Sequence, residues 1–256
     1  MPARPLAPAT PAIPRRRLLV LGHRGYRARY PENTLLAFRS ALEAGADGVE
    51  CDLQKTADGH YVVIHDPTVD RVTGAAGAVA RMSLAELRDL DFGRGERIPE
   101  LSDLLSILPA DSYLDLELKE ETLTSADCEP ILRILADRTD PERLMISSFE
   151  PELLRPFRAR GCVVGFLVGD RMMESGPQGL LSVLGGLRPQ YVNLPVETFS
   201  VLGRRRARFL VGSLRMMGCR VLWWTVNEPA ELALVARGAR IIVTDCVEEI
   251  LRAAGR

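Results

Sequence analysis

Residues 47–66, DGVECDLQKTADGHYVVIHD, decide the fold of this chain. They contain two runs that favour β-strands, at 47–54 and 61–66, and only the six residues KTADGH join them. Asp58-Gly59 is typical of a tight hairpin turn, whereas a crossover between parallel strands needs about a dozen residues or more. The second run is therefore expected to pair antiparallel with the first, as the other arm of a hairpin.

The rest of the chain alternates short apolar runs with patterns typical of helices. Nine runs are candidate strands: 17–22, 47–54, 61–66, 112–119, 143–149, 162–168, 190–195, 220–226 and 240–245. Helical patterns such as TLLAFRSALEAG, PELLRPFRARG and EPAELALVARG lie between them. With the third run assigned to the hairpin, eight strands remain, as in a (β/α)8 TIM barrel. The sequence therefore predicts an α/β protein with this barrel.

One domain is expected over residues 18–256, because barrels of this length fold as a single unit. Residues 1–17, MPARPLAPATPAIPRRR, carry too many prolines for a helix and are expected to form a disordered tail. The irregular, glycine-rich segment 67–98 follows the second-strand hairpin and is predicted to be a small insertion over the active-site end of the barrel. Within it, SLAE at 83–86 indicates a capping box that begins a short helix.

The composition argues against several classes of protein. A formal net charge of −1 gives no electrostatic basis for binding nucleic acid or an anionic membrane, and no apolar run reaches the roughly 18 residues of a membrane span. Five widely spaced cysteines without a CxxC pair favour neither a disulfide framework nor a zinc site. With no secretory signal pattern, a cytoplasmic protein with reduced thiols is expected.

Two further features are interpreted as structural. The three arginines at 204–206 are expected to form the solvated face of a helix. Met216 and Met217 are expected to pack, because methionine fills irregular gaps in cores. Neither feature is assigned to the active site.

Three carboxylates are predicted to meet at one end of the barrel. Glu50 and Asp52 have the i, i+2 spacing that places both side chains on one face of a strand. Glu117 and Lys119 share a face of the run at 112–119 in the same way. Active sites of parallel barrels lie at the carboxyl ends of the strands, where these carboxylates would repel one another without a cation. Oxygen ligands favour one hard divalent ion, Mg²⁺ or Ca²⁺, over zinc.

Two histidines flank this carboxylate group. His23 follows the first strand, and His65 ends the hairpin arm at 61–66. Either alone is as consistent with a structural role as with catalysis, but two of them beside charged neighbours indicate acid/base chemistry. Because successive side chains of a strand point to opposite faces, Trp223 and Trp224 are expected to lie on opposite sides of their strand. Trp224 is expected to point inward and line a substrate pocket, the alternative being that either ring merely fills the core.

An ordered series of motifs accompanies these residues. They are HRG at 23–25, PENT at 31–34, the E-x-D pair of GVECDL at 48–53, TADG at 56–59, VVIHD at 62–66, LELK at 116–119 and WTVN at 224–227. Together they resemble the glycerophosphodiester phosphodiesterase (GDPD) family. The resemblance extends over roughly residues 18–250, nearly the whole chain after the tail, and is therefore specific.

The resemblance implies a TIM-barrel enzyme that uses one divalent cation to hydrolyse small glycerophosphodiesters to sn-glycerol 3-phosphate and an alcohol. It implies roles for seven residues: His23 and His65 as general acid and base, Glu50, Asp52 and Glu117 as metal ligands, and Arg24 and Lys119 as phosphate-binding groups. The glycerol 2-hydroxyl is a candidate first nucleophile, through a cyclic phosphate that water then opens.

Three alternatives stay open on the sequence. One is a lysophospholipase D-like enzyme or a cyclising phosphodiester lyase. Another is a non-catalytic phosphodiester-binding barrel, although a binding protein has no need of two proton-transfer groups. The third concerns PENT: Glu32 and Asn33 could orient Arg24 or the metal ligands, or Asn33 could be the N-cap of the helix that follows.

Overall fold

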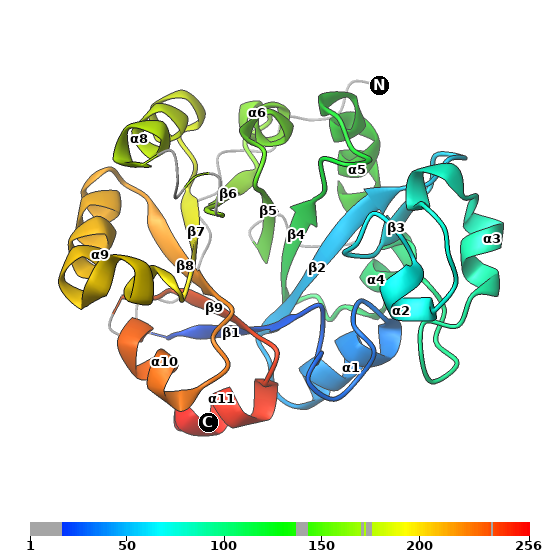
Figure 1. Ribbon diagram of the computed structural model, residues 1–256, viewed down its shortest axis with the longest axis horizontal. Helices are drawn as coiled ribbons and strands as arrows, with labels where there is room; N and C mark the ends of the chain where they lie inside the picture. Colours follow the sequence, from blue (N-terminus) through cyan, green and yellow to red (C-terminus); the bar gives the residue numbers. More distant parts are fainter. Residues whose placement is uncertain (1–16, 137–142, 170–171, 173–175, 237) are drawn as a thin grey trace.

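A closed barrel of eight parallel strands forms the centre of the molecule (Figure 1). The computed structural model describes residues 17–136, 143–169, 172, 176–236 and 238–256. The barrel strands are β1 (Leu19–His23), β2 (Gly48–Lys55), β4 (Tyr113–Leu118), β5 (Leu144–Ser148), β6 (Val163–Leu167), β7 (Tyr191–Pro195), β8 (Arg220–Trp224) and β9 (Ile241–Thr244). Each strand pairs with the next, and β1 pairs with both β2 and β9, which closes the ring. The predicted TIM barrel is confirmed.

The hairpin that fixed this strand count is also present. β3 (Tyr61–Val63) runs antiparallel to β2, with Leu53 opposite Val63 and Lys55 opposite Tyr61. The arm is shorter than the predicted run, since the strand ends at Val63. Beyond Val63 the buried side chain of Gln54 replaces the strand pairing. Its amide donates to the carbonyl oxygens of His65 at 2.9 Å and Asp66 at 2.6 Å. Gln54 thereby fixes the backbone that carries His65.

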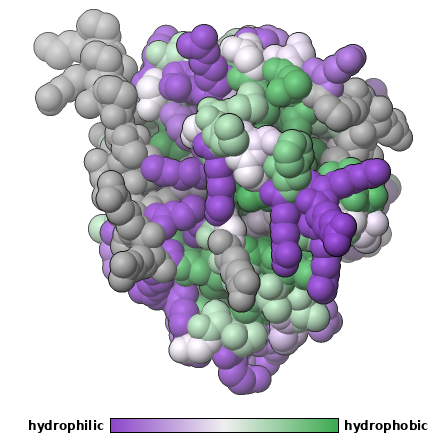
Figure 2. Space-filling model, turned by 90° about the vertical axis from the view of Figure 1, so that its left-hand side faces the viewer, coloured by the Kyte–Doolittle hydropathy of each residue, from purple (hydrophilic) through white to green (hydrophobic). Residues whose placement is uncertain are grey.

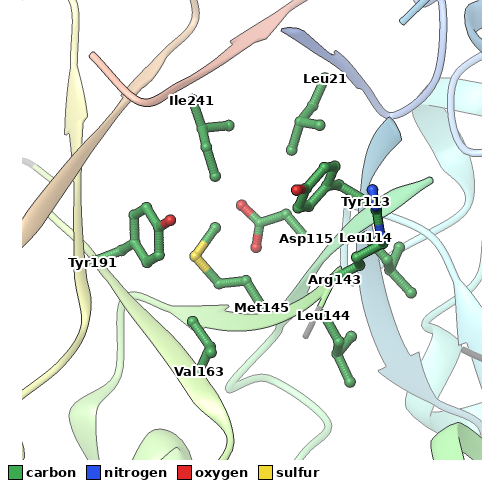
Figure 3. A pocket seen from close by; sticks show the side chains of 10 residues that line it. All are labelled: Leu21, Tyr113, Leu114, Asp115, Arg143, Leu144, Met145, Val163, Tyr191 and Ile241. Atoms are coloured by element: carbon green, nitrogen blue, oxygen red, sulfur yellow. The ribbon is translucent and has the colours of Figure 1, made fainter. Parts of the chain in front are cut away.

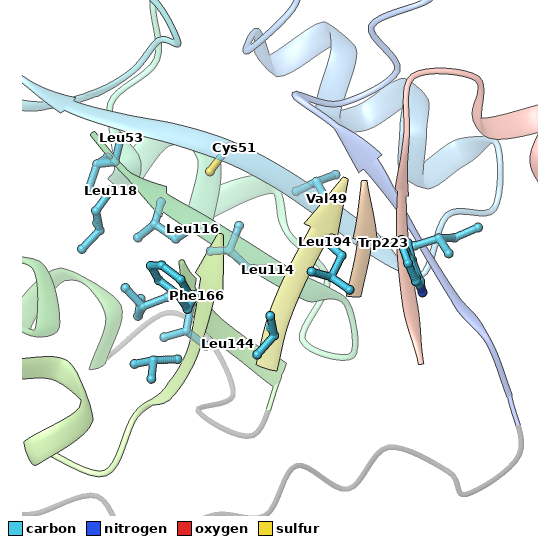
Figure 4. Close-up of a cluster of buried hydrophobic side chains, with 14 of the residues drawn as sticks. Val49, Cys51, Leu53, Leu114, Leu116, Leu118, Leu144, Phe166, Leu194 and Trp223 are labelled. Atoms are coloured by element: carbon cyan, nitrogen blue, oxygen red, sulfur yellow. The ribbon is translucent and has the colours of Figure 1, made fainter. Parts of the chain in front are cut away.

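Helices surround the barrel and cover the outer face of its strands (Figure 1). They are α1 (Leu35–Glu43), α4 (Leu101–Ile107), η2 (Ser125–Asp127), α5 (Cys128–Ala136), α6 (Pro151–Ala159), α8 (Gly176–Leu187), α9 (Thr198–Met216), α10 (Pro229–Val235) and α11 (Val247–Ala253). Alternate residues of β2 and β4 face these helices: Val49, Cys51, Leu53, Leu114, Leu116 and Leu118 (Figure 4). By the two-residue period of a strand, the residues between them face the barrel interior.

The segment between the hairpin and α4 has a small core of its own. It contains α2 (Asp70–Thr73), η1 (Val79–Arg81) and α3 (Leu84–Asp89), which lie beside β3 (Figure 1). Their apolar side chains pack with those of Val62 and Ile64. Ser83 caps α3 in the reciprocal arrangement expected from SLAE, with Glu86 as partner. The tail predicted at 1–17 lies outside the described residues, apart from Arg17, whose guanidinium pairs with Asp47 at 3.0 Å.

Apolar and aromatic side chains fill the amino-terminal half of the barrel interior. They are Leu19, Leu21, Tyr113, Met145, Val163, Tyr191 and Ile241. Leu222 and Val243 pack with them and also line the cavity at the other end of the barrel. Figure 3 shows part of this layer lying around the side chain of Asp115. The cavity left there measures about 20 Å³, room for about one water molecule. The described strands are therefore packed at this level, and the cavity that the predicted site residues line is at the other end.

Candidate active site

A cavity of about 230 Å³ opens at the carboxyl ends of the barrel strands. Six of the eight predicted site residues line it: His23, Arg24, Glu50, His65, Glu117 and Trp224. The other two, Asp52 and Lys119, form ion pairs with the first group, as described below. The structure therefore brings all the predicted site residues to one place.

The three carboxylates come from neighbouring strands. Glu50 and Asp52 face inward from β2, and Glu117 lies directly opposite Asp52 on β4. All three are buried, and one ligand oxygen of each lies within 4.8 Å of the others. Burial and the neighbouring carboxylates hold the pKa of Glu50 well above its usual range. Burial likewise raises the pKa of Glu117 to about 7, against the opposing charge of Lys119.

This donor set fits a divalent cation. Oxygen Oε1 of Glu50 is buried and has no hydrogen-bond partner among the described residues, so it is free to coordinate. A buried carboxylate held close to two others is costly unless a cation offsets the charge. Three carboxylate oxygens and no sulfur or imidazole match the preferences of Mg²⁺ and Ca²⁺. Within the described parts of the chain, Glu50, Asp52 and Glu117 form the only group of this kind.

Lys119 and Arg24 partly neutralise this group from two sides. Lys119 Nζ lies 2.8 Å from Asp52 Oδ1 and also bonds to Glu117. Arg24 Nε lies 3.2 Å from Asp52 Oδ2. Although burial alone would raise it, the charges of Lys119 and Arg24 hold the pKa of Asp52 below its ordinary value. Asp52 is thus ionised while its two neighbours retain protons more readily.

The loop after β1 is strained where it meets the carboxylates. Arg24 has a φ of 52° and Asn33 a φ of 56°, in the left-handed region that costs a non-glycine residue about 1–3 kcal/mol. The Arg24 backbone N–H donates to Glu50 Oε2 at 2.9 Å, and the Asn33 side-chain amide donates to Asp52 Oδ2 at 2.8 Å. Such strain persists where surrounding contacts impose it, and here both residues bind a predicted metal ligand.

These contacts decide between the two interpretations of PENT. Glu32 accepts from Arg24 Nη1 at 2.9 Å and from Arg71 of the insertion, while Asn33 orients Asp52. The N-cap of α1 is Thr34, whose hydroxyl accepts from the Ala37 N–H. Asn33 is not the cap, because its positive φ turns it toward the site. PENT therefore both positions the site and starts the helix, one residue later than the alternative proposed.

Each histidine is held by a carboxylate. His23 Nδ1 lies 2.7 Å from Asp245 Oδ1, and His65 Nδ1 lies 2.7 Å from Asp66 Oδ1. A carboxylate only accepts hydrogen bonds, so Nδ1 carries the proton and Nε2 keeps a free lone pair. Burial lowers the pKa of both histidines, although their carboxylate partners oppose this. The lowered pKa favours the neutral form of each ring, in which Nε2 is available to accept a proton.

The far wall of the cavity is aromatic. The ring of Trp224 meets that of Phe149 edge to face, with centroids 5.8 Å apart. Its indole N–H donates to the Asn193 carbonyl at 3.1 Å, which fixes the ring on the rim of the barrel. Trp223 points the other way and stacks on Phe199 in the first turn of α9. The two tryptophans thus alternate, with Trp224 at the cavity.

Comparison with known proteins identifies the family. The model of the glycerophosphoryl diester phosphodiesterase family matches residues 23–249. The chain belongs to this family. A glycerophosphodiester phosphodiesterase of Caldanaerobacter subterraneus subsp. tengcongensis is 33% identical over 245 residues, which cover 91% of this chain and 96% of that protein. The resemblance drawn from the motifs and the expectation of an enzyme are confirmed.

Solved structures of the family share the fold. A glycerophosphodiester phosphodiesterase of Thermotoga maritima matches with a TM-score of 0.79 and 30% identity, over 92% of this chain and 98% of that one. A phosphodiesterase of Oleispira antarctica, solved with the product sn-glycerol-3-phosphate, matches with a TM-score of 0.79 and 26% identity, over 93% and 97%. In this chain, none of the described helices is long and apolar enough to cross a bilayer.

Three carboxylates at the site were given no role from the sequence. Asp245 follows β9 and Asp66 follows His65, and a carboxylate just beyond a strand is the signal that could have found them. Asp115 shares the inward face of β4 with Glu117, so the same alternation that located Glu117 also pointed to it. Burial raises the pKa of Asp115 to about 7, despite a hydrogen bond from the Ser147 hydroxyl at 2.6 Å.

Proposed function

We propose that this protein hydrolyses glycerophosphodiesters to sn-glycerol 3-phosphate and an alcohol, using one divalent cation and two histidines. The observation that carries the proposal is the meeting of three buried carboxylates and two carboxylate-held histidines at one cavity. A structural relative from Oleispira antarctica binds sn-glycerol-3-phosphate as its product, which supports the same chemical class of substrate here.

Glu50, Asp52 and Glu117 are the residues that would hold the cation. When bound, Mg²⁺ or Ca²⁺ would supply Lewis-acid polarisation of the phosphoryl group and offset its charge. Arg24 and Lys119 add positive charge beside these ligands and would stabilise the extra negative charge of the transition state. Because carboxylates already hold the side chains of Arg24 and Lys119 in place, these two groups need little reorganisation during the reaction.

His23 and His65 would move the protons. Nε2 of one histidine, in its neutral form, takes the proton of the attacking oxygen. The other histidine reacts as the imidazolium, with both ring nitrogens protonated, and its Nε2 gives a proton to the departing alcohol oxygen. Exchange of protons with solvent then restores both histidines. Asp245 and Asp66 hold Nδ1 protonated and stabilise the imidazolium while it exists. A hydrolase needs two proton-transfer groups, whereas a protein that only binds phosphodiesters has no use for them.

Trp224 and Phe149 would enclose the substrate opposite the charged wall. Their rings meet edge to face and form an apolar corner, and Trp224 is held in place by the hydrogen bond of its indole N–H. In a glycerophosphodiester one charged phosphate joins two alcohol groups. The phosphate would lie beside Arg24 and Lys119, and one of the alcohol groups would lie against the rings. The cavity of about 230 Å³ is of the size that suits a small molecule.

The test is hydrolysis of glycerophosphocholine and glycerophosphoethanolamine, followed by phosphorus NMR, with added Mg²⁺ or Ca²⁺ or with EDTA. We expect linear glycerol 3-phosphate, formed only when a divalent cation is present. Glu50→Gln keeps the shape of the side chain and removes its charge, and is expected to abolish turnover. Glu43→Gln makes the same change at an exposed position of α1 and is the matched control.

The outcomes separate the alternatives. Turnover that persists in EDTA would contradict the role of the cation. A cyclic phosphate as the sole product would favour a lyase, and binding of substrate without turnover would favour a binding protein. Full activity of Glu50→Gln would contradict the assignment of the carboxylates.

A further inference from the structure

Helix α9 and the residue that follows it expose large apolar side chains to solvent. Met216 is 92% exposed and Phe209 79% exposed, and Val201 and Met217 are also exposed. Among the described residues, only one other large apolar side chain, that of Leu181, is classed as exposed. The interpretation of Met216 and Met217 as packing residues is therefore wrong. No part of the proposed catalytic mechanism uses this side of the molecule.

The exposed side chains lie in a line along the outer face of α9. Gly203, with a φ of 76°, breaks the helix, so residues 204–216 form a separate straight part. Its buried residues Ala207, Val211 and Leu214 face the barrel. At 100° per residue, Phe209 and Met216 point almost directly away from them, two turns and about 10 Å apart.

Arginines surround this line. Residues 198–219 contain five arginines (Arg204, Arg205, Arg206, Arg208 and Arg215) and no aspartate or glutamate. All five are exposed. Arg215 donates to the carbonyl of Gly238, and no carboxylate of the described residues pairs with the other four. Arg205 lies one turn before Phe209 on the same line, and Arg204 and Arg208 lie along one flank. The net charge of −1 conceals this concentration of positive charge.

We propose that the outer face of residues 204–216 docks on the surface of an anionic lipid bilayer. In this arrangement the arginines contact lipid phosphates, and Phe209 and Met216 enter the boundary between headgroups and acyl chains. Figure 2 shows the side of the molecule on which α8 and α9 lie, where hydrophilic and hydrophobic side chains occur next to one another. The helix would lie on the membrane and not cross it, in keeping with the absence of a spanning helix among the described residues.

Charge and geometry favour lipid over other occupants. Two copies of this helix would place five arginines against five, which repel. Nucleic acid would be held by the arginines alone, because its phosphate backbone is bound by positive and polar groups. The most outward positions of the face are instead Phe209 and Met216. Positive charge around a protruding apolar pair matches a surface that is anionic outside and apolar within.

Vesicle co-sedimentation of the full chain tests this proposal. We expect binding to vesicles of phosphatidylcholine with phosphatidylglycerol, little binding to phosphatidylcholine alone, and weaker binding at high salt. Replacing Arg205 and Arg208 together by Ser is expected to lower the partition coefficient about 25-fold, at about fivefold for each arginine near an anionic surface. Arg39→Ser, at an exposed position of α1, is the matched control and should bind like the wild type.

A second variant separates lipid from other anionic partners. Replacing Phe209 and Met216 together by Ser retains every arginine and is expected to weaken vesicle binding, with unchanged thermal unfolding because both side chains are exposed. The proposal is overturned if the wild type does not bind the anionic vesicles, or if both double variants bind like the wild type. It is also overturned if the wild type binds duplex DNA in place of vesicles, or forms a dimer that Phe209→Ser dissociates.

Discussion

The two ends of the barrel interior are built from the same strands but have opposite character. On β4, Tyr113 faces the apolar end and Glu117 the open end; on β5, Met145 and Ser147 divide in the same way. The apolar end leaves a cavity of about 20 Å³, and the open end one of about 230 Å³. Advancing along a strand by two or four residues therefore changes an environment that stabilises the fold into one that carries the chemistry.

The charged end of the barrel lowers the stability of the fold, and burial of apolar side chains at the other end offsets that loss. Three buried carboxylates within reach of one another destabilise the metal-free protein, as the pKa of about 7 for Glu117 indicates. A close-packed layer of large side chains lies beneath them and contributes burial free energy without any part in the reaction. If this division is correct, substitutions at one end should change turnover and substitutions at the other should change stability.

The largest effect is expected from His65→Ala at the charged end. Loss of a general acid or base lowers the rate about 10²–10⁴-fold, and we expect that loss in kcat with glycerophosphocholine as substrate. Thermal unfolding should change little, because Gln54 holds this segment by the backbone carbonyls. His60→Ala is the matched control, since His60 is exposed and pairs with Glu100 outside the cavity. Equal losses in both variants would contradict the role of His65.

Met145→Ala at the apolar end is expected to do the reverse. Met145 is buried in the lower layer, and truncating a buried methionine costs about 2–5 kcal/mol of unfolding free energy. Urea denaturation should show that loss, while kcat of the folded enzyme stays near the wild-type value. Met216→Ala, at an exposed methionine, should leave both quantities unchanged. A large fall in kcat for Met145→Ala would show that the two ends are not separable.

Strand alternation carried most of what the sequence could predict. The short linker before β3 settled which run was the hairpin arm, and the i, i+2 spacing placed Glu50 with Asp52. These are local patterns, and a strand repeats them every two residues. The resemblance of the motif series to the family added proposed roles for His23 and His65, which periodicity cannot supply.

Contacts between distant segments were beyond those patterns. Asp245 holds His23 across 222 residues of chain, and no spacing rule connects a residue of β1 with the end of β9. The left-handed backbone of Arg24 and Asn33 depends on bonds to β2, so it also follows only from the folded structure. On α9, helical periodicity could place Met216 on a face, but which face the barrel covers was decided by tertiary packing.

The smallest effect is expected at Asp245, whose carboxylate holds His23 at the charged end. Asp245→Asn keeps the shape but weakens a charge-assisted hydrogen bond worth about 1.5–3 kcal/mol, so kcat/KM should fall about 10- to 100-fold. Burial lowers the pKa of His23, and the bond to Asp245 partly raises it again. Removing the carboxylate charge should lower that pKa further.

A pH profile distinguishes this positioning role from a purely structural one. His23 must be neutral to accept a proton, so activity falls as the pH drops through its pKa. In Asp245→Asn the acid limb of kcat/KM is therefore expected at lower pH than in the wild type. Asp66→Asn should act on His65 in the same direction, because its geometry is the same. A limb that moves to higher pH would mean that Asp245 does not set the charge of His23 and that the charged end is organised mainly by β2 and β4.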